Sequence, residues 1–305
     1  MPITLYESFR AVFYTPFYLV HALDHYRRHG LDVRLGTSPD LAGVAGQLQS
    51  GEADVFWGGP MRVMLMRDRD PSCDVVGFAE VVTRDPFFLV GREPRPEFRL
   101  TDLATVRVAT VSEVPTPWMC LQDDLRRVGI DPSTLDRIDG HTMSENAQAL
   151  RAGSIDVAQL FQPMVETLLA EGAGHVWYAQ ASRGPCSYTT LYAMRPWLAR
   201  NPDTALAMTR AIHDTQRWLH AHDAATIADA VADFFRDCPR PILVRAIARY
   251  LELGVWGRDP RLPRVGFERL RGCLLSGGLI GRAIAFEDAV DNSYAEAAVG
   301  STAAD

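Results

Sequence analysis

Polar, cationic and aromatic side chains follow the strand-like segments of this sequence at their carboxyl ends. Such positions suit ligand binding, because the carboxyl ends of parallel strands meet at one sheet edge and lead into helix N-termini. In the first half of the chain, the candidate ligand contacts are Arg10, Tyr14, Thr15, Thr37, Ser38, Gly58, Gly59, Pro60 and Arg62. In the second half they are Ser112, Thr116, Trp118, Thr142, Ser144, Gln159, Phe161, Gln162 and Tyr188.

These residue types favour anion binding. A helix N-terminus offers unpaired N–H groups and about half a positive charge, and proline is well suited to the first helical position. Several predicted helices start at one edge of the sheets, and two arginines lie nearby. The predicted helix starts are Thr15-Pro16, Gly59-Pro60, Thr116-Pro117 and Gln162-Pro163. The pattern predicts an anionic or strongly polar ligand.

A purely structural interpretation stands beside each of these assignments. Thr15 and Thr116 also fit helix N-caps, and Gly58 with Gly59 fits a tight turn. The two arginines also fit ion pairs, and Trp118 fits a core position. The sequence leaves both interpretations open.

The signals for catalysis are weak. Glu7, Glu80, Glu113 and His141 could each act as acid or base at the cleft, and Glu113 with His141 is the catalytic pair expected if the protein is an enzyme. No nucleophile elbow, zinc-protease motif or phosphate loop is present. We therefore predict no cofactor.

Three histidines could hold a metal ion. His21, His25 and His29 follow one helical face at a spacing of four residues. Because Arg27 and Arg28 lie beside them, a solvated helix face is the expected alternative. We predict no metal site.

Composition excludes several classes of protein. The chain has 305 residues, of which 47% are hydrophobic, and no apolar run approaches the length of a membrane span. The formal charge of −7 argues against nucleic acid as a partner. Five widely spaced cysteines form no CxxC motif, so buried, unpaired thiols are expected.

Two copies of one sequence pattern organise the chain, about a hundred residues apart. The matched segments are 15–32 with 116–131, 47–55 with 149–157, and 60–61 with 163–164. Within each copy, β-branched segments alternate with helical ones, which predicts parallel-rich, doubly wound sheets. The predicted fold class is therefore α/β, with two similar lobes, a ligand cleft between them and a helical C-terminal segment.

The repeat also predicts the division of the chain. Residues 1–85 and 195–305 form the first lobe, and residues 92–187 form the second. The strand-like segments 86–91 and 188–194 are the two crossings between them. The late helices, from residue 203 onward, are expected to pack on the first lobe.

Several runs carry a resemblance to a known family. The segment from Thr15 to Val33 and the run QLQSGEADVFWGGP at 47–60 closely resemble the start of type II periplasmic solute-binding proteins for sulfonate, nitrate, taurine and thiamine-pyrimidine precursors. The segment from Gly278 to Tyr294 resembles that family's C-terminus. The resemblance implies a Venus-flytrap cleft, capture of a small organic anion, aromatic compound or heterocycle, and delivery to an ABC permease.

The resemblance also leaves alternatives. The family has cytoplasmic enzyme relatives, so a dehydratase or decarboxylase of a carboxylated substrate, or a ligand-sensing domain, remains open. The cysteine-rich motif and histidine of the fungal pyrimidine synthases are missing, because Gly59 to Arg62 follow the third strand. The first residues carry no export signal, so we expect a periplasmic location if a signal was removed and a cytoplasmic one if Met1 is the native start.

Overall fold

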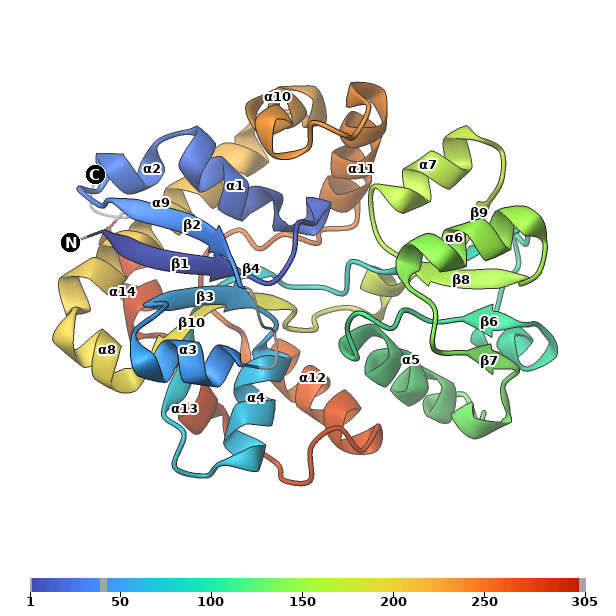
Figure 1. The fold of residues 1–305 in the computed structure, drawn as a ribbon, viewed down its shortest axis with the longest axis horizontal. Helices are drawn as coiled ribbons and strands as arrows, with labels where there is room; N and C mark the ends of the chain where they lie inside the picture. Colours follow the sequence, from blue (N-terminus) through green and yellow to red (C-terminus); the bar gives the residue numbers. More distant parts are fainter. Residues whose placement is uncertain (1, 39–42, 302–305) are drawn as a thin grey trace.

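The computed structural model describes residues 2–38 and 43–301, which form two lobes (Figure 1). Each lobe contains a five-stranded sheet covered by helices on both faces. The first sheet has the order β2 (Val33–Thr37), β1 (Ile3–Glu7), β3 (Val55–Gly58), β10 (Thr189–Met194), β4 (Val75–Val82). The second has the order β7 (Arg137–Ile138), β6 (Val108–Ala109), β8 (Val157–Leu160), β5 (Phe88–Gly91), β9 (His175–Ala179).

The two sheets share one plan, which confirms the predicted fold class. In the first, β1 runs parallel to β2 and β3, and β10 runs antiparallel between β3 and β4. In the second, β6 runs parallel to β7 and β8, and β5 runs antiparallel between β8 and β9. Each antiparallel strand is the first strand that the chain forms after passing from one lobe to the other.

The predicted division of the chain stays a prediction, although its two crossing segments can be located. Strands β5 and β10 lie inside these segments and pair within the second and the first sheet. The stretches between strands of different sheets are 83–87 and, after a short 3-10 helix η4 (Gln180–Arg183), 184–188. The Cys186 N–H donates to the Thr83 carbonyl, so the two stretches are joined. We call these two stretches the connections.

Seven helices belong to the two sequence copies. The helices ending at Gly51 and Gly153 have these glycines as C-caps with φ of 76° and 73°, as the repeat predicts. In the first lobe they are α1 (Thr15–Ala22), α2 (His25–Arg28), α3 (Val44–Ser50) and α4 (Pro60–Arg69). In the second they are α5 (Thr116–Arg127), α6 (Met143–Ala152) and α7 (Met164–Ala170).

Two details of these helices differ from the prediction. Thr15 and Thr116 are the first residues of α1 and α5, so their assignment as N-caps is wrong. The single helix expected after Thr15 breaks at Asp24, whose φ of 56° is left-handed, and α2 then follows. The Thr15 hydroxyl makes a different hydrogen bond from that of an N-cap. Its Oγ1 donates to the Val12 carbonyl at 2.6 Å.

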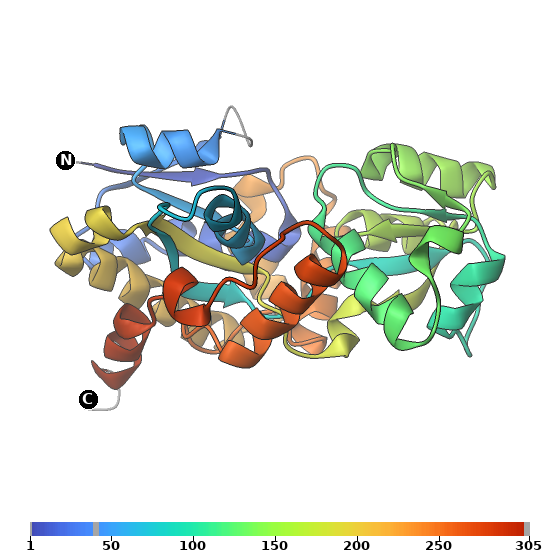
Figure 2. The same ribbon diagram turned by 90° about the horizontal axis from the view of Figure 1, so that it is seen from below.

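The C-terminal helices join the two lobes as well as covering the first. Helix α9 packs on α1 and α2, as expected, and α14 packs on α9. In addition, α11 packs against α7 and α12 packs against α5 of the second lobe (Figures 1 and 2). This group comprises α8 (Arg195–Arg200), α9 (Pro202–Ala221), α10 (Ala224–Ala230), α11 (Arg240–Glu252), α12 (Arg264–Ser276), α13 (Phe286–Ala289) and α14 (Ser293–Ser301).

The histidine face packs against protein rather than solvent. His25 Nδ1 lies 2.7 Å from Thr215 Oγ1, and His29 Nε2 lies 2.7 Å from Asp214 Oδ2, both on α9. Burial lowers the pKa of His21 to about 4. The expected solvated face is therefore wrong. In residues 2–38 and 43–301, no cluster of His, Cys, Asp or Glu is suited to a metal ion, and no helix could span a membrane.

A buried ion network ties the connections to the second lobe. The Arg183 guanidinium, with 1% of its side chain exposed, pairs with Asp85 of the first connection. It also donates from Nε to Asp124 of α5 at 2.9 Å. Arg269 of α12 reaches the same Asp124 at 3.4 Å. The relative position of the lobes is thus fixed by charges that have been taken out of water.

Removing the central cation should destabilise the fold strongly. Arg183→Met leaves two buried carboxylates without their main countercharge, which costs about 3–5 kcal/mol of unfolding free energy. Urea denaturation of the variant measures this loss. Arg236→Met, which removes an exposed ion pair with Asp233, is the control and should leave the midpoint close to unchanged. Equal midpoints for both variants would show that the buried network contributes nothing.

Candidate ligand-binding site

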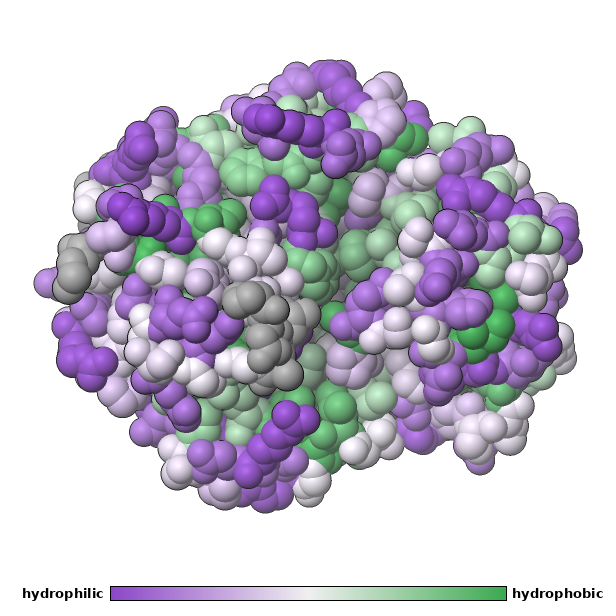
Figure 3. Space-filling model, in the orientation of Figure 1, coloured by the Kyte–Doolittle hydropathy of each residue, from purple (hydrophilic) through white to green (hydrophobic). Residues whose placement is uncertain are grey.

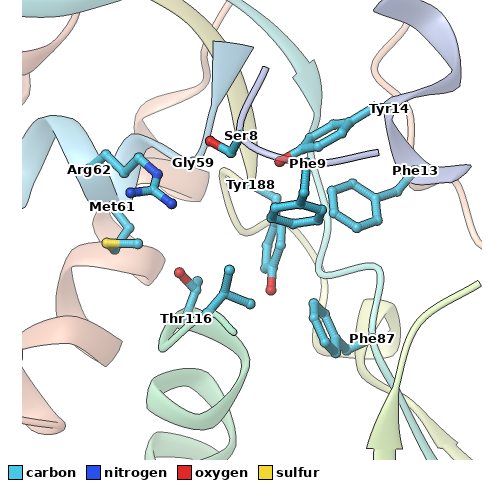
Figure 4. A pocket seen from close by; sticks show the side chains of 11 residues that line it. Ser8, Phe9, Phe13, Tyr14, Gly59, Met61, Arg62, Phe87, Thr116 and Tyr188 are labelled. Atoms are coloured by element: carbon cyan, nitrogen blue, oxygen red, sulfur yellow. The ribbon is translucent and has the colours of Figure 1, made fainter. Parts of the chain in front are cut away.

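A cavity lies between the lobes, at the carboxyl ends of β1 and β3. Figure 3 shows the hollow between the lobes, with hydrophobic residues in its depth. Its empty space is about 390 Å³, including the part that opens to solvent. The lining comes from the loop after β1, the starts of α4 and α5, and both connections. It consists of Ser8, Phe9, Phe13, Tyr14, Gly59, Met61, Arg62, Phe87, Val114, Thr116 and Tyr188 (Figure 4).

One side of the cavity is an aromatic wall. Phe9 and Phe13 of the first lobe face Phe87 and Tyr188 of the connections (Figure 4). The ring centroids of Phe13 and Tyr188 are 6.3 Å apart. Phe161, after β8, supports the wall through edge contacts with Phe13 at 5.2 Å and Phe87 at 5.1 Å. Such a wall suits a flat apolar or aromatic group.

Two buried hydroxyl groups face this space without a partner. Ser8 Oγ and Tyr188 OH have no hydrogen-bond partner among the described residues. Burial raises the pKa of Tyr188 well above its usual value, so its phenol stays protonated and can donate. An unpaired buried hydroxyl costs free energy, and a polar ligand atom would recover that cost.

The opposite side of the cavity is positive. Arg62, in the first turn of α4, directs its guanidinium toward Thr116 and Tyr188 (Figure 4). Burial raises the pKa of Tyr14, and the charge of Arg62 partly offsets that rise. The N-termini of α4 and α5 have no side-chain cap, and both begin at the cavity. A negative group placed here would meet an arginine and two helix dipoles.

Gly58 allows a close approach behind the cavity. A Cβ atom at this position would lie 3.3 Å from the Tyr192 ring, which is tighter than an ordinary contact. At Gly59 it would lie 3.4 Å from the Tyr188 carbonyl oxygen, which is an ordinary contact. Gly58 therefore lets the end of β3 pack closely against β10, and Pro60 begins α4 shortly after it.

A groove continues from the cavity along α4. It shares Met61 and Arg62 with the cavity and has about 800 Å³ of empty space, including the part open to solvent. Its lining is mainly apolar and ends near Arg69. The remaining residues that line it are Val44, Ala45, Leu65, Met66, Glu113 and Pro115.

The two-lobed fold also occurs in known proteins. A family model described as NMT1/THI5 like matches residues 13–226, which is more than half of the chain. The chain belongs to the NMT1/THI5-like family. This confirms the family resemblance that the sequence motifs carry.

Proteins similar to this NMT1/THI5-like chain in sequence or in fold include binding proteins and an enzyme. YtlA of Bacillus subtilis (strain 168), whose name places it among binding proteins, is 27% identical over 292 residues, covering 95% of this chain and 87% of YtlA. The alkanesulfonate-binding protein SsuA of Xanthomonas axonopodis pv. citri, solved with MOPS, has a TM-score of 0.72 at 13% identity, covering 96% and 98%. The desulfurization enzyme DSZB has a TM-score of 0.70 at 14% identity, covering 98% and 99%. Both structural likenesses show the fold.

Among the predicted ligand contacts, five line the cavity: Tyr14, Gly59, Arg62, Thr116 and Tyr188. Gly58, Pro60 and Phe161 lie directly behind this lining. Their role in binding remains a prediction, and the structure brings these eight residues together in one place.

Four predicted contacts of the first lobe have protein partners instead. Glu7 accepts from Arg10 Nη2 at 2.8 Å and, more weakly, from Thr37 Oγ1 at 3.4 Å. Ser38 donates to Gln47 Oε1 at 2.9 Å, and Thr15 is fully buried. None of the four lines the cavity.

The second lobe shows a similar division. Gln159 donates to the Pro117 carbonyl at 3.0 Å, and Gln162 accepts from the backbone N–H of Glu166, which places both in structural roles. Trp118 lies under the Arg137 guanidinium at 4.3 Å, away from the cavity. Ser112 and Ser144 are exposed, and Thr142 caps α6.

The residues expected to act in an enzyme do not line the cavity, although Glu113 lines the groove that continues from it. Glu113 accepts from the backbone N–H of Met143 at 2.8 Å, so it serves the start of α6. His141 precedes that helix and does not line the cavity. Glu7 binds Arg10, and Glu80 is fully buried in β4, where burial raises its pKa to about 8 and the nearby Ser187 hydroxyl offsets only part of that rise.

Sequence reasoning missed six lining residues: Ser8, Phe9, Phe13, Met61, Phe87 and Val114. Ser8 and Phe9 follow β1 directly, so the rule about strand ends could have found them. Met61 and Phe87 are neighbours of predicted positions. Phe13 and Val114 face the cavity only because of how their turns fold.

The unpaired hydroxyl of Tyr188 gives a prediction about the free protein. Tyr188→Phe should leave the unfolding free energy unchanged or raise it by up to about 1 kcal/mol, because an unsatisfied buried group is removed. The matched control is Tyr250→Phe, whose hydroxyl accepts from Gln162 N and donates to the Pro86 carbonyl, both at 3.0 Å. That variant should lose about 1–3 kcal/mol in urea denaturation. A comparable loss in Tyr188→Phe would contradict the assignment.

Glu80 gives a prediction about pH. Because burial raises its folded pKa to about 8, the folded state keeps a proton that the unfolded chain releases near its ordinary pKa. Stability should therefore fall as pH rises from about 5 to 8, by up to about 4 kcal/mol. Glu80→Gln should flatten this slope, whereas Glu52→Gln, which removes an exposed carboxylate, should not. Urea midpoints across this pH range measure the slope, and identical profiles in all three proteins would disprove the idea.

Proposed function

We propose that this protein is a solute-binding protein that captures a small organic anion with a flat apolar or aromatic part. The observation that carries the proposal is the cavity itself, which sets an aromatic wall opposite Arg62 and two uncapped helix N-termini. A carboxylate or sulfonate bound by Arg62 would place its apolar part against Phe9, Phe13 and Phe87.

The lining chemistry supports binding more than catalysis. The described residues of the lining include no carboxylate, imidazole or thiol, so an acid or base would have to come from the ligand or from water. Both tyrosines of the lining have pKa values raised by burial, which keeps them protonated at neutral pH. Such groups can orient a ligand by hydrogen bonding.

Delivery to an ABC permease in the periplasm is part of the proposal. The family membership and the name of the relative YtlA support capture of a solute, and SsuA, which shares the fold, binds an alkanesulfonate by its name. Contacts from both lobes would favour the closed form when a ligand is bound, and a permease could recognise that form.

A matched series of small ligands tests the proposal. Benzenesulfonate should raise the melting temperature most, methanesulfonate less, and the cation benzylamine not at all. We expect this order because the cavity has Arg62 on one side, which favours an anion, and an aromatic wall on the other, which favours a ring. No shift with benzenesulfonate, benzoate or a pyrimidine carboxylate, or an equal shift with benzylamine, would refute the assignment.

The role of Arg62 can be measured separately. Arg62→Gln should weaken benzenesulfonate binding about tenfold to a hundredfold in calorimetry, because a charge-assisted contact to the anion is lost. Arg236→Gln removes one positive charge far from the cavity and is the control. If both variants bind equally well, Arg62 does not hold the anion.

A further inference from the structure

Three buried thiols meet where the second lobe contacts the first. Cys120 lies on α5 of the second lobe, Cys186 in the second connection and Cys273 on α12. Each is 0% exposed, and all three belong to one hydrophobic cluster otherwise built from the first lobe and the C-terminal helices. The second lobe therefore inserts Cys120 into the core of the first.

The Cys120 thiol interacts with both of the other thiols. Cys120 Sγ lies 4.0 Å from Cys186 Sγ, although the residues are 66 positions apart in the chain. A disulfide needs a separation of about 2.05 Å, so the two sulfurs must approach by roughly 2 Å. The bond therefore requires the side chains to rotate or the connection to shift.

We propose that Cys120 and Cys186 form a disulfide under oxidising conditions and that this bond fixes the second lobe against the first. The proposal does not depend on which ligand the cavity binds.

The chemistry is thiol–disulfide exchange with a disulfide oxidant. The Cys120 thiolate attacks one sulfur of oxidised glutathione, forms a mixed disulfide and releases one glutathione thiolate. The Cys186 thiolate then attacks the Cys120 sulfur, forms the protein disulfide and releases the second glutathione thiolate. The two thiol protons pass to solvent or to the released thiolates, so the protein loses two electrons and the oxidant gains them.

Burial sets when this exchange can happen. The contact with Cys186 and the absence of water raise the pKa of Cys120 well above its usual value, so the closed protein is inert. Exchange therefore requires α5 to separate from α12, or occurs while the chain folds. Once formed, the bond opposes that separation.

The bond would act on the ligand cavity. Cys120 lies one helical turn after Thr116, and Cys186 lies two residues before Tyr188, and both Thr116 and Tyr188 line the cavity. A link between the cysteines would hold these two walls at a fixed distance. Opening of the cleft would be restricted while its closed shape stays the same.

Peptide mapping tests the pairing directly. The full chain carrying Cys238→Ala, which removes the partly exposed thiol, is held or refolded in oxidised glutathione and digested without reductant. We expect a Cys120–Cys186 linked peptide that disappears with dithiothreitol. A link from Cys120 to Cys273 would overturn the proposal. So would a result in which Cys120, Cys186 and Cys273 all stay free, both when the protein is held and when it is refolded in oxidised glutathione.

Variants and a second measurement make the result independent of folding defects. Cys73→Ala changes a buried thiol of the same cluster and should retain the link, whereas Cys186→Ala should abolish it. If Cys186→Ala does not fold, hydrogen exchange of residues 112–122, compared between the oxidised and the reduced protein, still tests whether the bond restrains the second lobe. Oxidation should slow this exchange about tenfold, and equal rates would show that the bond does not restrain the lobe.

Discussion

The structure depends on a single arginine buried where the two lobes meet. Arg183 follows the last strand of the second lobe, and its guanidinium spans Asp85 in one connection and Asp124 in α5. These three charges have almost no exposure, and removing the arginine would leave two carboxylates without their main countercharge in a nonpolar setting. This pairing fixes the two connections and α5 relative to each other. Phe87 and Tyr188 in the connections and Thr116 at the start of α5 thereby acquire set positions, and the cavity between them exists as a consequence.

Among the described residues that line the cavity, the formal charge comes from Arg62. The phenols of the lining have pKa values raised by burial and stay neutral, and the arginine at the start of α4 and the dipoles of α4 and α5 contribute positive potential. Among the described residues, two carboxylates near the cavity have protein partners: Glu7 binds Arg10, and Glu113 accepts from the start of α6. A ligand that enters with a negative charge is therefore not opposed by a neighbouring free acid of the lining. Selectivity then depends on how well its apolar part fits the aromatic wall.

The sequence predicts the architecture well because local signals repeat. Gly51 and Gly153 end equivalent helices, and Pro60 starts a helix after a buried strand, so two copies of one supersecondary unit are visible without a structure. It predicts the site only in part. Strand ends locate Tyr14, Gly59, Arg62 and Thr116, but the same rule also selects Arg10 and Thr37, which bind Glu7. Whether a polar side chain faces a ligand or a neighbouring residue depends on tertiary contacts, and the histidine face was misjudged for the same reason, since α9 comes from almost two hundred residues later.

Both lobes and the connections contribute to the cavity lining, so the proposed binding would be coupled to lobe closure. Most of the aromatic wall belongs to the first lobe and the connections, whereas Val114 and Thr116 come from the second lobe. A ligand held between them gains its full contact area only when the lobes are together, so its binding free energy is spent partly on closure. On the far side of the connections, α12 packs against α5, and α11 packs against α7, where Arg249 pairs with Glu166 at 2.6 Å. Both contacts join the second lobe to the C-terminal helices, so the lobes meet through these helices as well as through the cavity lining.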